Sequence, residues 1–193
     1  MGKGRPRTAS KRATKAGGGR IVSAVLENAD VFRTAKTNGT IPKEPAKLVL
    51  RRPPDFDRKD FDRKARDLQR LSQQGKLKKA KSERPKILDR NSGEMRTKSQ
   101  IYRERMIRKL ERKKSQGHNV KDTLWRLYAG KGNVGPGKGL DPDHIHELQL
   151  DGPDEYHNLR LKDTYANRMM GSDISTALRN VPEGHPVTIR VIP

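Results

Sequence analysis

The scarcity of large aliphatic residues is the feature that most limits what this chain can fold into. Leu, Ile, Val and Phe number 37 among 193 residues, and the formal net charge is +21. Both values lie at the edge of the range that is typical of disordered proteins. The length allows one domain, or one small domain plus extended segments.

The composition also excludes several classes of protein. No apolar run approaches the roughly 20 residues needed to cross a bilayer, so no membrane span is predicted. The basic N-terminus lacks the apolar stretch of a secretory signal peptide. The chain contains no cysteine, which excludes a disulfide partner, a thiolate metal site and a Cys nucleophile.

The charge is distributed unevenly along the chain. Residues 51–116 carry 24 Lys and Arg against ten acids, whereas residues 141–193 carry five against nine. We predict a disordered basic tail over 1–20, a basic helical region over 21–116, a short helix and Gly-rich linker over 117–140, and a separate module over 141–193. The default partner of such a chain is a polyanion.

The spacing of apolar residues predicts helices over 21–32, 57–74 and 99–115, and a short helix near Asn119. Their apolar stripes are narrow, and a solvated basic region is one interpretation. Contact with nucleic acid is favoured, because so many cations repel one another unless a polyanion neutralises them. Residues 132–139 approximate a phosphate-binding loop, but Gly139 replaces the required Ser or Thr and Pro136 removes an N–H, so no nucleotide site is predicted.

The most informative stretch runs from residue 143 to residue 178. Ile145, Leu148 and Leu150 predict an extended arm, and residues 151–154 supply turn chemistry. Leu159 and Leu161 alternate with polar residues and predict a short strand. Apolar residues at helical spacing then predict a helix from residue 163 onward.

Within this stretch, Asp143-His144, Asn158-Leu159 and Asn167 resemble the HNH (His-Me finger, ββα-metal) endonuclease motif. The resemblance covers about residues 138–180. This stretch is similar to the C-terminal nuclease domains of bacterial polymorphic toxins. It implies an α+β fold: a C-terminal ββα-metal finger preceded by a basic, mainly helical and partly disordered N-terminal region. It also implies a metal-dependent endonuclease that hydrolyses DNA and acts as a toxin or effector.

The roles of these residues follow from what phosphodiester hydrolysis requires. A neutral imidazole is the natural base for the attacking water, which makes His144 the candidate general base. Asp143 and Asn167 are the candidate ligands of a divalent cation; oxygen ligands favour Mg²⁺, with Mn²⁺ as an alternative and Zn²⁺ disfavoured. By the resemblance, Asn158 bonds backbone across the hairpin loop and supports His144.

Three neighbouring residues are secondary candidates, each with an ordinary alternative. His146 would contact phosphate or metal, or be a solvated histidine. Asp163 would be a second metal ligand, but a helix N-cap is favoured. Arg168 would bind a phosphate or face water. His157 and His185 are predicted to lie on the surface.

The leading hypothesis is a DNA endonuclease, with nucleic acid as its substrate and an acidic immunity protein as a further partner. It would act in the cytoplasm or be delivered into a target cell by a secretion system. One alternative is a basic nucleic-acid-binding protein without catalysis. Another is an HNH nuclease that acts on RNA or in phage homing or packaging.

Overall fold

A three-stranded sheet in the order β1–β2–β7 joins the two ends of the described chain. The computed structural model describes residues 19–192. β1 (Ala24–Leu26) pairs antiparallel with β2 (Ala46–Arg51), and β2 pairs in parallel with β7 (Val187–Ile192). β2 is therefore the central strand, and it buries Leu48 and Leu50 completely.

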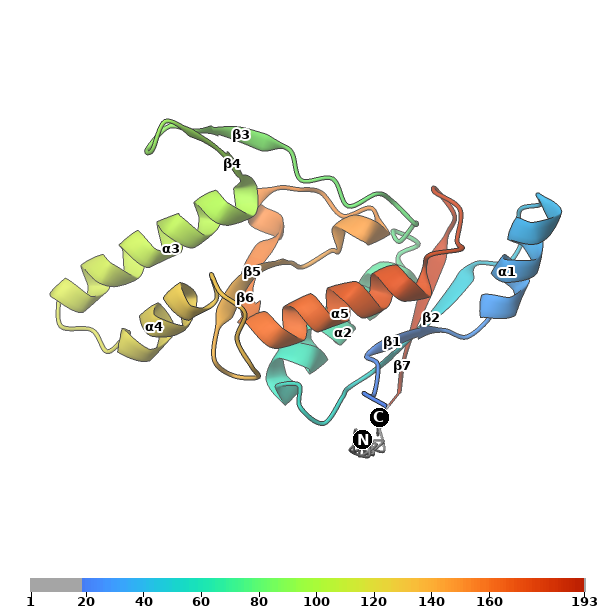
Figure 1. Ribbon diagram of the computed structural model, residues 1–193, viewed down its shortest axis with the longest axis horizontal. Coiled ribbons are helices and arrows are strands. Elements are labelled where there is room, and N and C mark those ends of the chain that lie inside the picture. Colours follow the sequence, from blue (N-terminus) through green and yellow to red (C-terminus); the bar gives the residue numbers. More distant parts are fainter. Residues whose placement is uncertain (1–18, 193) are drawn as a thin grey trace, which may run out of the picture.

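α2 (Arg58–Gln73) and α5 (Thr164–Ala177) pack against this sheet, and α1 (Ala29–Asn38) lies beyond it at the end of the molecule (Figure 1). The Asp57 side chain caps α2 by accepting from the backbone N–H of Asp60 at 2.8 Å. One face of α2 then buries Phe61, Ala65 and Leu68 in the main hydrophobic cluster. That cluster includes side chains from β1, β2, α2, α5 and β7, so it is a single core built from both halves of the chain.

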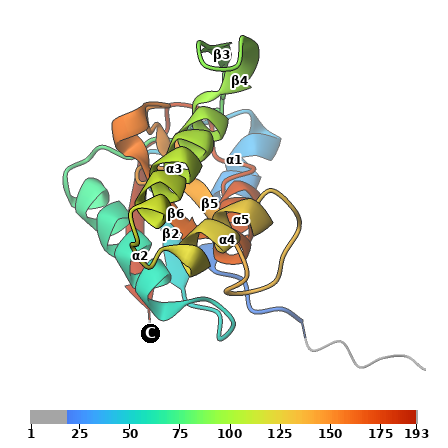
Figure 2. The same cartoon turned by 90° about the vertical axis from the view of Figure 1, so that its left-hand side faces the viewer.

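A second, smaller cluster lies at the other end of the molecule. α3 (Lys98–Ser115) and α4 (Lys121–Ala129) pack side by side there (Figure 2), below the two-stranded ribbon of β3 (Lys86–Asp89) and β4 (Glu94–Thr97). Thr97 and Gln100 form a capping box at the start of α3. The cluster contains Leu124 and Leu127 of α4 and reaches Leu140.

Between the two clusters runs an antiparallel hairpin of β5 (Leu140–His144) and β6 (Leu159–Asp163). Two short 3₁₀ turns, η1 (Leu148–Leu150) and η2 (Tyr156–Asn158), occupy its long loop. α2 holds the hairpin from one side: Arg63 donates to the carbonyl of Leu161 at 3.0 Å, and Asp60 accepts from the N–H of Asp163 at 2.7 Å. The predicted division at residue 140 thus does not separate two cores.

The mixed α+β class and the helices predicted over 57–74 and 99–115 are confirmed. The helix predicted over 21–32 is wrong, because β1 and the start of α1 occupy that segment and β1 pairs with β2. The region over 21–116 also contains four strands, so it is less helical than predicted. Residues 1–18 of the predicted tail lie outside the described residues.

Two further predictions are wrong. The extended arm expected around Ile145 to Leu150 is a turn, and the strand lies earlier, at β5. An alternating strand buries every second residue, whereas Leu148, Gln149 and Leu150 are all buried, which the 3₁₀ turn allows. His185 is buried rather than on the surface; its Nε2 lies 2.8 Å from the carbonyl oxygen of Glu44. Among residues 19–192 no helix is long and apolar enough to cross a membrane.

Candidate active site

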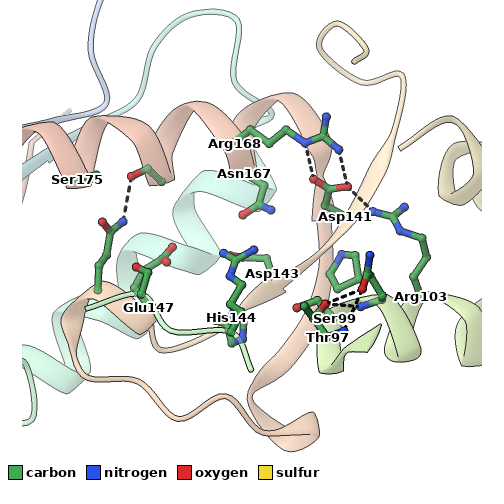
Figure 3. A pocket seen from close by; sticks show the side chains of 16 residues that line it. Thr97, Ser99, Arg103, Asp141, Asp143, His144, Glu147, Asn167, Arg168 and Ser175 are labelled. Atoms are coloured by element: carbon green, nitrogen blue, oxygen red, sulfur yellow. Dashed lines mark hydrogen bonds and ion pairs between the residues drawn. The ribbon is translucent and has the colours of Figure 1, made fainter. Parts of the chain in front are cut away.

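The β5–β6 hairpin and α5 form the walls of a cavity of about 620 Å³. Asp143 and His144 line it from the end of β5, and Asn167 projects into it from α5 (Figure 3). Asn158 lies under the hairpin loop and is not part of the lining. The fold therefore brings three of the four predicted residues to one cavity. The opposite wall comes from a second set of polar residues: Ser82, Arg84, Thr97, Ser99, Gln100 and Arg103.

The His144 imidazole is held by a carboxylate from the hairpin loop. Its Nε2 lies 2.9 Å from Oδ1 of Asp154, and the two side chains are 3% and 11% exposed. An ionised carboxylate only accepts hydrogen bonds, which assigns the imidazole proton to Nε2 and leaves the lone pair on Nδ1. The second oxygen of Asp154 is buried without a partner among the described residues. His144 and Asp154 thus form a histidine–carboxylate pair.

Asn158 supports this pair from beneath the loop. Its side-chain oxygen accepts from the N–H of His146 at 2.8 Å, and its amide donates to the carbonyls of His146 and Pro153 at 2.9 and 2.8 Å. These bonds join both ends of the loop, directly beside His144 and Asp154. Asn158 is therefore a positioning residue rather than a group that meets substrate.

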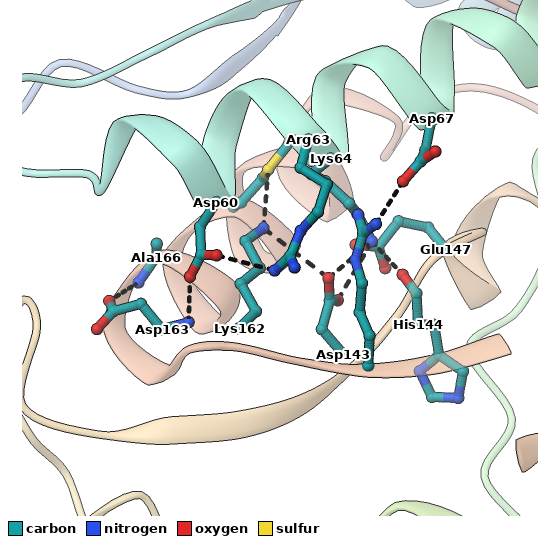
Figure 4. Close-up of polar contacts among 12 residues, drawn as sticks. Asp60, Arg63, Lys64, Asp67, Asp143, His144, Glu147, Lys162, Asp163 and Ala166 are labelled. Atoms are coloured by element: carbon teal, nitrogen blue, oxygen red, sulfur yellow. Dashed lines mark hydrogen bonds and ion pairs between the residues drawn. The ribbon is translucent and has the colours of Figure 1, made fainter. Parts of the chain in front are cut away.

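Asp143 points away from His144, because adjacent residues of a strand face opposite sides. Figure 4 shows its carboxylate meeting Lys64 of α2. Both oxygens of Asp143 lie 3.2 Å from the Lys64 Nζ, which is also 2.8 Å from Glu147. The Nζ of Lys162 is 4.0 Å from the same carboxylate. Two lysines and two carboxylates therefore form a buried cluster of four charges.

The pKa values in this cluster follow from burial and from the nearest charges. Burial acts to lower the pKa of Lys64, but Asp143 and Glu147 outweigh it and hold that pKa above its usual value. Burial acts to raise the pKa of Asp143, but Lys64 and Lys162 hold it below its usual value. For Lys162 burial dominates and lowers the pKa, since its carboxylate partner is farther away. Lys64 is thus the principal counter-ion of Asp143.

This pairing bears on the predicted Mg²⁺ site. Mg²⁺ requires ligand oxygens at about 2.0–2.1 Å in a near-octahedral shell, and the Lys64 ammonium already contacts both oxygens of Asp143. Within residues 19–192, no group of three or more His, Cys, Asp or Glu side chains is placed to hold a metal ion. As arranged, Asp143 and Asn167 do not form a cation site.

Arginines supply the positive charge of the cavity. Arg103 and Arg168 both pair with Asp141, the latter at 2.9 Å, and Arg168 also donates to the carbonyls of Gly130 and Gly132 at 2.7 Å. These bonds fix Arg168 while its side chain remains 43% exposed. Arg84 is exposed and pairs with no acidic side chain in the described part of the chain. The cavity therefore presents guanidinium groups opposite His144.

The other two secondary candidates have structural contacts. The Nε2 of His146 lies 2.7 Å from the carbonyl oxygen of Leu150, which ties the ring to its own loop, and β5 ends before this residue. His146 is not among the residues that line the cavity. Asp163 caps α5 by accepting from the N–H of Ala166 at 3.0 Å, as the sequence predicts.

Asp154, Lys64 and Glu147 are the functional candidates that the sequence interpretation missed. Asp154 belongs to a turn-forming run, which hides its second role. Lys64 carries a readable signal: it stands between Phe61 and Leu68 on the buried face of α2, where a lysine needs a buried counter-charge.

No family model, curated protein or solved structure matches the chain significantly. The fold and the site define an α+β protein in which a histidine paired with a carboxylate lines a cavity that also contains arginines.

Proposed function

We propose that this protein is an endonuclease that hydrolyses phosphodiester bonds, with DNA as the favoured substrate. The observation that carries the proposal is the His144–Asp154 pair, whose histidine lines a cavity that Arg84, Arg103 and Arg168 also line. A general base and fixed positive charge are what attack of water on a phosphodiester requires. The β5–β6–α5 order and the HNH-like motif support the same reaction class.

The chain's own residues account for the proton and for the developing charge. Nδ1 of His144 takes a proton from water as the water oxygen bonds to phosphorus and the bond to the leaving oxygen breaks. Asp154 stabilises the imidazolium that forms, through the proton on Nε2. The arginines stabilise the negative charge on the phosphate oxygens. The leaving oxygen takes a proton from solvent.

A requirement for Mg²⁺ stays a prediction. Asp143 would have to leave the Lys64 ammonium before binding a cation. Activity should therefore be measured with Mg²⁺, Mn²⁺, Zn²⁺ and EDTA in parallel. Activity that persists in EDTA would contradict the metal requirement and leave the role of His144 in place.

Nicking of supercoiled plasmid tests the proposal. His144→Ala should lower the rate by about 10²- to 10⁴-fold, the usual contribution of a general base. His157→Ala is the matched control, because His157 is exposed on the same hairpin loop. Wild-type protein that leaves plasmid and RNA intact under every metal condition, or a His144→Ala variant with wild-type activity, would refute the proposal.

A basic nucleic-acid-binding protein without catalysis is the second candidate. The commitment of Asp143 to Lys64 favours it, because that pairing removes a predicted metal ligand. In that case the protein should retard labelled DNA without cutting it. Cleavage of RNA but not of DNA would instead assign the chemistry to the RNA or phage-type alternative.

The motif further leads us to propose an effector role with an acidic immunity partner. Expression in the bacterial cytoplasm should then be toxic, and His144→Ala should abolish the toxicity. Toxicity that persists in His144→Ala would contradict nuclease action as its cause.

A further inference from the structure

Two aromatic side chains on α4 face solvent. Trp125 is 57% exposed and Tyr128 is 44% exposed, while Leu124 and Leu127 of the same helix are buried. Residues three and four apart lie on one helix face, so Lys121, Trp125 and Tyr128 form a single exposed stripe. Large exposed aromatics lose hydrophobic free energy unless something covers them.

This stripe is continuous with the cavity that contains His144. The Nζ of Lys131 lies 5.5 Å from the centroid of the Tyr128 ring and 2.9 Å from Oε1 of Glu104. A second cavity, also of about 620 Å³, is lined by Glu104 and Lys131 together with Arg103 and Arg168. Both arginines also line the first cavity.

We name the series Arg168, Arg103, Lys131, Tyr128, Trp125 and Lys121 the α4 track. It begins at the cavity and ends on α4. Figure 2 shows α3 and α4 lying together along this end of the molecule.

The charge along the α4 track is positive. Residues 98–131 contain eleven Lys and Arg and three acids. Two of those acids are occupied, since Glu104 pairs with Lys131 and Glu111 accepts from the Tyr128 hydroxyl at 2.5 Å. The α4 track therefore offers cations to a polyanion and the exposed ring of Trp125 to a flat ligand.

We propose that the α4 track binds single-stranded nucleic acid, with phosphates on its cations and an unpaired base stacked on Trp125. Exposed aromatics beside lysines and arginines are how proteins hold single strands, because every base has a face that stacks. Bases in a duplex are already stacked and offer no such face. That the bound strand is the one cut rests on the proposed function, whereas binding itself does not.

Trp125 is the only tryptophan of the chain, so its fluorescence reports on the α4 track alone. The full chain carrying His144→Ala, kept in EDTA, should show Trp quenching with oligothymidylate and little change with duplex DNA of equal length. Polyglutamate is tested in parallel, because an acidic protein is the alternative ligand of the α4 track. Quenching by polyglutamate but not by oligothymidylate would overturn the proposal.

Binding of labelled oligothymidylate, followed by anisotropy, tests the residues. Trp125→Ala should weaken binding about 5- to 150-fold, with Ile41→Ala as control because Ile41 is 71% exposed on a distant loop. Lys121→Ala should reduce the slope of log affinity against log salt by about 0.7, and Lys43→Ala should not. Equal affinity in Trp125→Ala and Ile41→Ala would refute the stacking role. Binding without cleavage would refute the proposed function only.

Discussion

Lys64 is the residue on which the buried charges of the site depend. It is completely buried and is held by Asp143 and Glu147. Removing one member of a buried ionic cluster leaves the others unpaired, which costs far more than losing a surface ion pair. Lys64 also links α2 to β5 through the carbonyl of His144. It therefore stabilises the core and the site together.

We expect Lys64→Met to lower the free energy of unfolding by about 3–5 kcal/mol, because two buried carboxylates lose their cation. Urea denaturation measures this. Lys59→Met on the exposed side of the same helix should change it by less than about 0.5 kcal/mol. If the two variants unfold at the same urea concentration, Lys64 does not have this role.

Asp154 sets which nitrogen of His144 carries the proton. In Asp154→Asn the neutral amide no longer fixes the proton on Nε2 and no longer stabilises the imidazolium. We expect the nicking rate to fall by about 10²- to 10⁴-fold. Asp151→Asn, at an exposed position of the same loop, is the control. A fully active Asp154→Asn variant would show that the tautomer is irrelevant.

At the residue scale, the prediction that His144 and Asn158 belong to one hairpin is confirmed. The lysine that pairs with Asp143 was not predicted. Local spacing indicates which residues share a strand or a helix. It does not indicate that α2, about eighty residues earlier, carries a lysine to the back of β5. The partners of buried charges depend on long-range packing, which a short motif does not contain.

The hairpin loop is the element that aligns the site. Gly152 lies so close to the carbonyls of His146 and Glu147 that a Cβ would overlap backbone atoms. Asp151 adopts a left-handed conformation with φ of 69°. Together with Asn158, this tight turn fixes where Asp154 emerges. The turn predicted for residues 151–154 therefore also orients the Asp154 carboxylate toward His144.

Gly152→Ala should displace this loop, cost about 1–3 kcal/mol of stability and reduce nicking as Asp154 moves away from His144. Thermal unfolding and plasmid nicking on the same preparation measure both effects. Gly135→Ala is the control, since a Cβ there meets nothing within 4 Å. Unchanged activity in Gly152→Ala would contradict the alignment role of the loop.

Among the elements, α2 and α3 are predictable because their signals are local. α2 and α3 have caps and an apolar face in their own sequence. The strands are less predictable, because β1 is only three residues long and both β1 and β7 become strands by pairing with β2. Val25 at helical spacing from Ile21 is compatible with either structure until that partner is known.

For the whole molecule, Asp173 ties the start of the described chain to α5. Its carboxylate accepts from the N–H and hydroxyl of Ser23, both at 2.7 Å, and from Arg20 at 3.1 Å. Burial acts to raise the pKa of Asp173, but the hydrogen bonds from Arg20 and Ser23 outweigh it and hold the pKa below its usual value. The ionised form is therefore the one that the folded state prefers.

The resulting stability depends on pH in a defined direction. The unfolded chain binds the Asp173 proton first, near pH 4, so the contribution is present above that pH and is lost as the pH falls through the lower folded-state pKa. We expect Asp173→Asn to lower stability by about 1.5–3 kcal/mol at neutral pH. Urea unfolding over a pH series should show the difference shrinking below about pH 4. A difference that stays constant in acid would contradict this, and Asp30→Asn, on an exposed turn of α1, should show none.

The pairing of β2 with β7 imposes an order on the nascent chain. The ribosome delivers β2 early and β7 after every other element described above, so one edge of the central strand waits open during synthesis. Open strand edges recruit other chains, which makes this interval the time of greatest aggregation risk. A chain released before β7 would carry the proposed site residues without the sheet that supports them. β7 must therefore be synthesised before the sheet that supports the site can close.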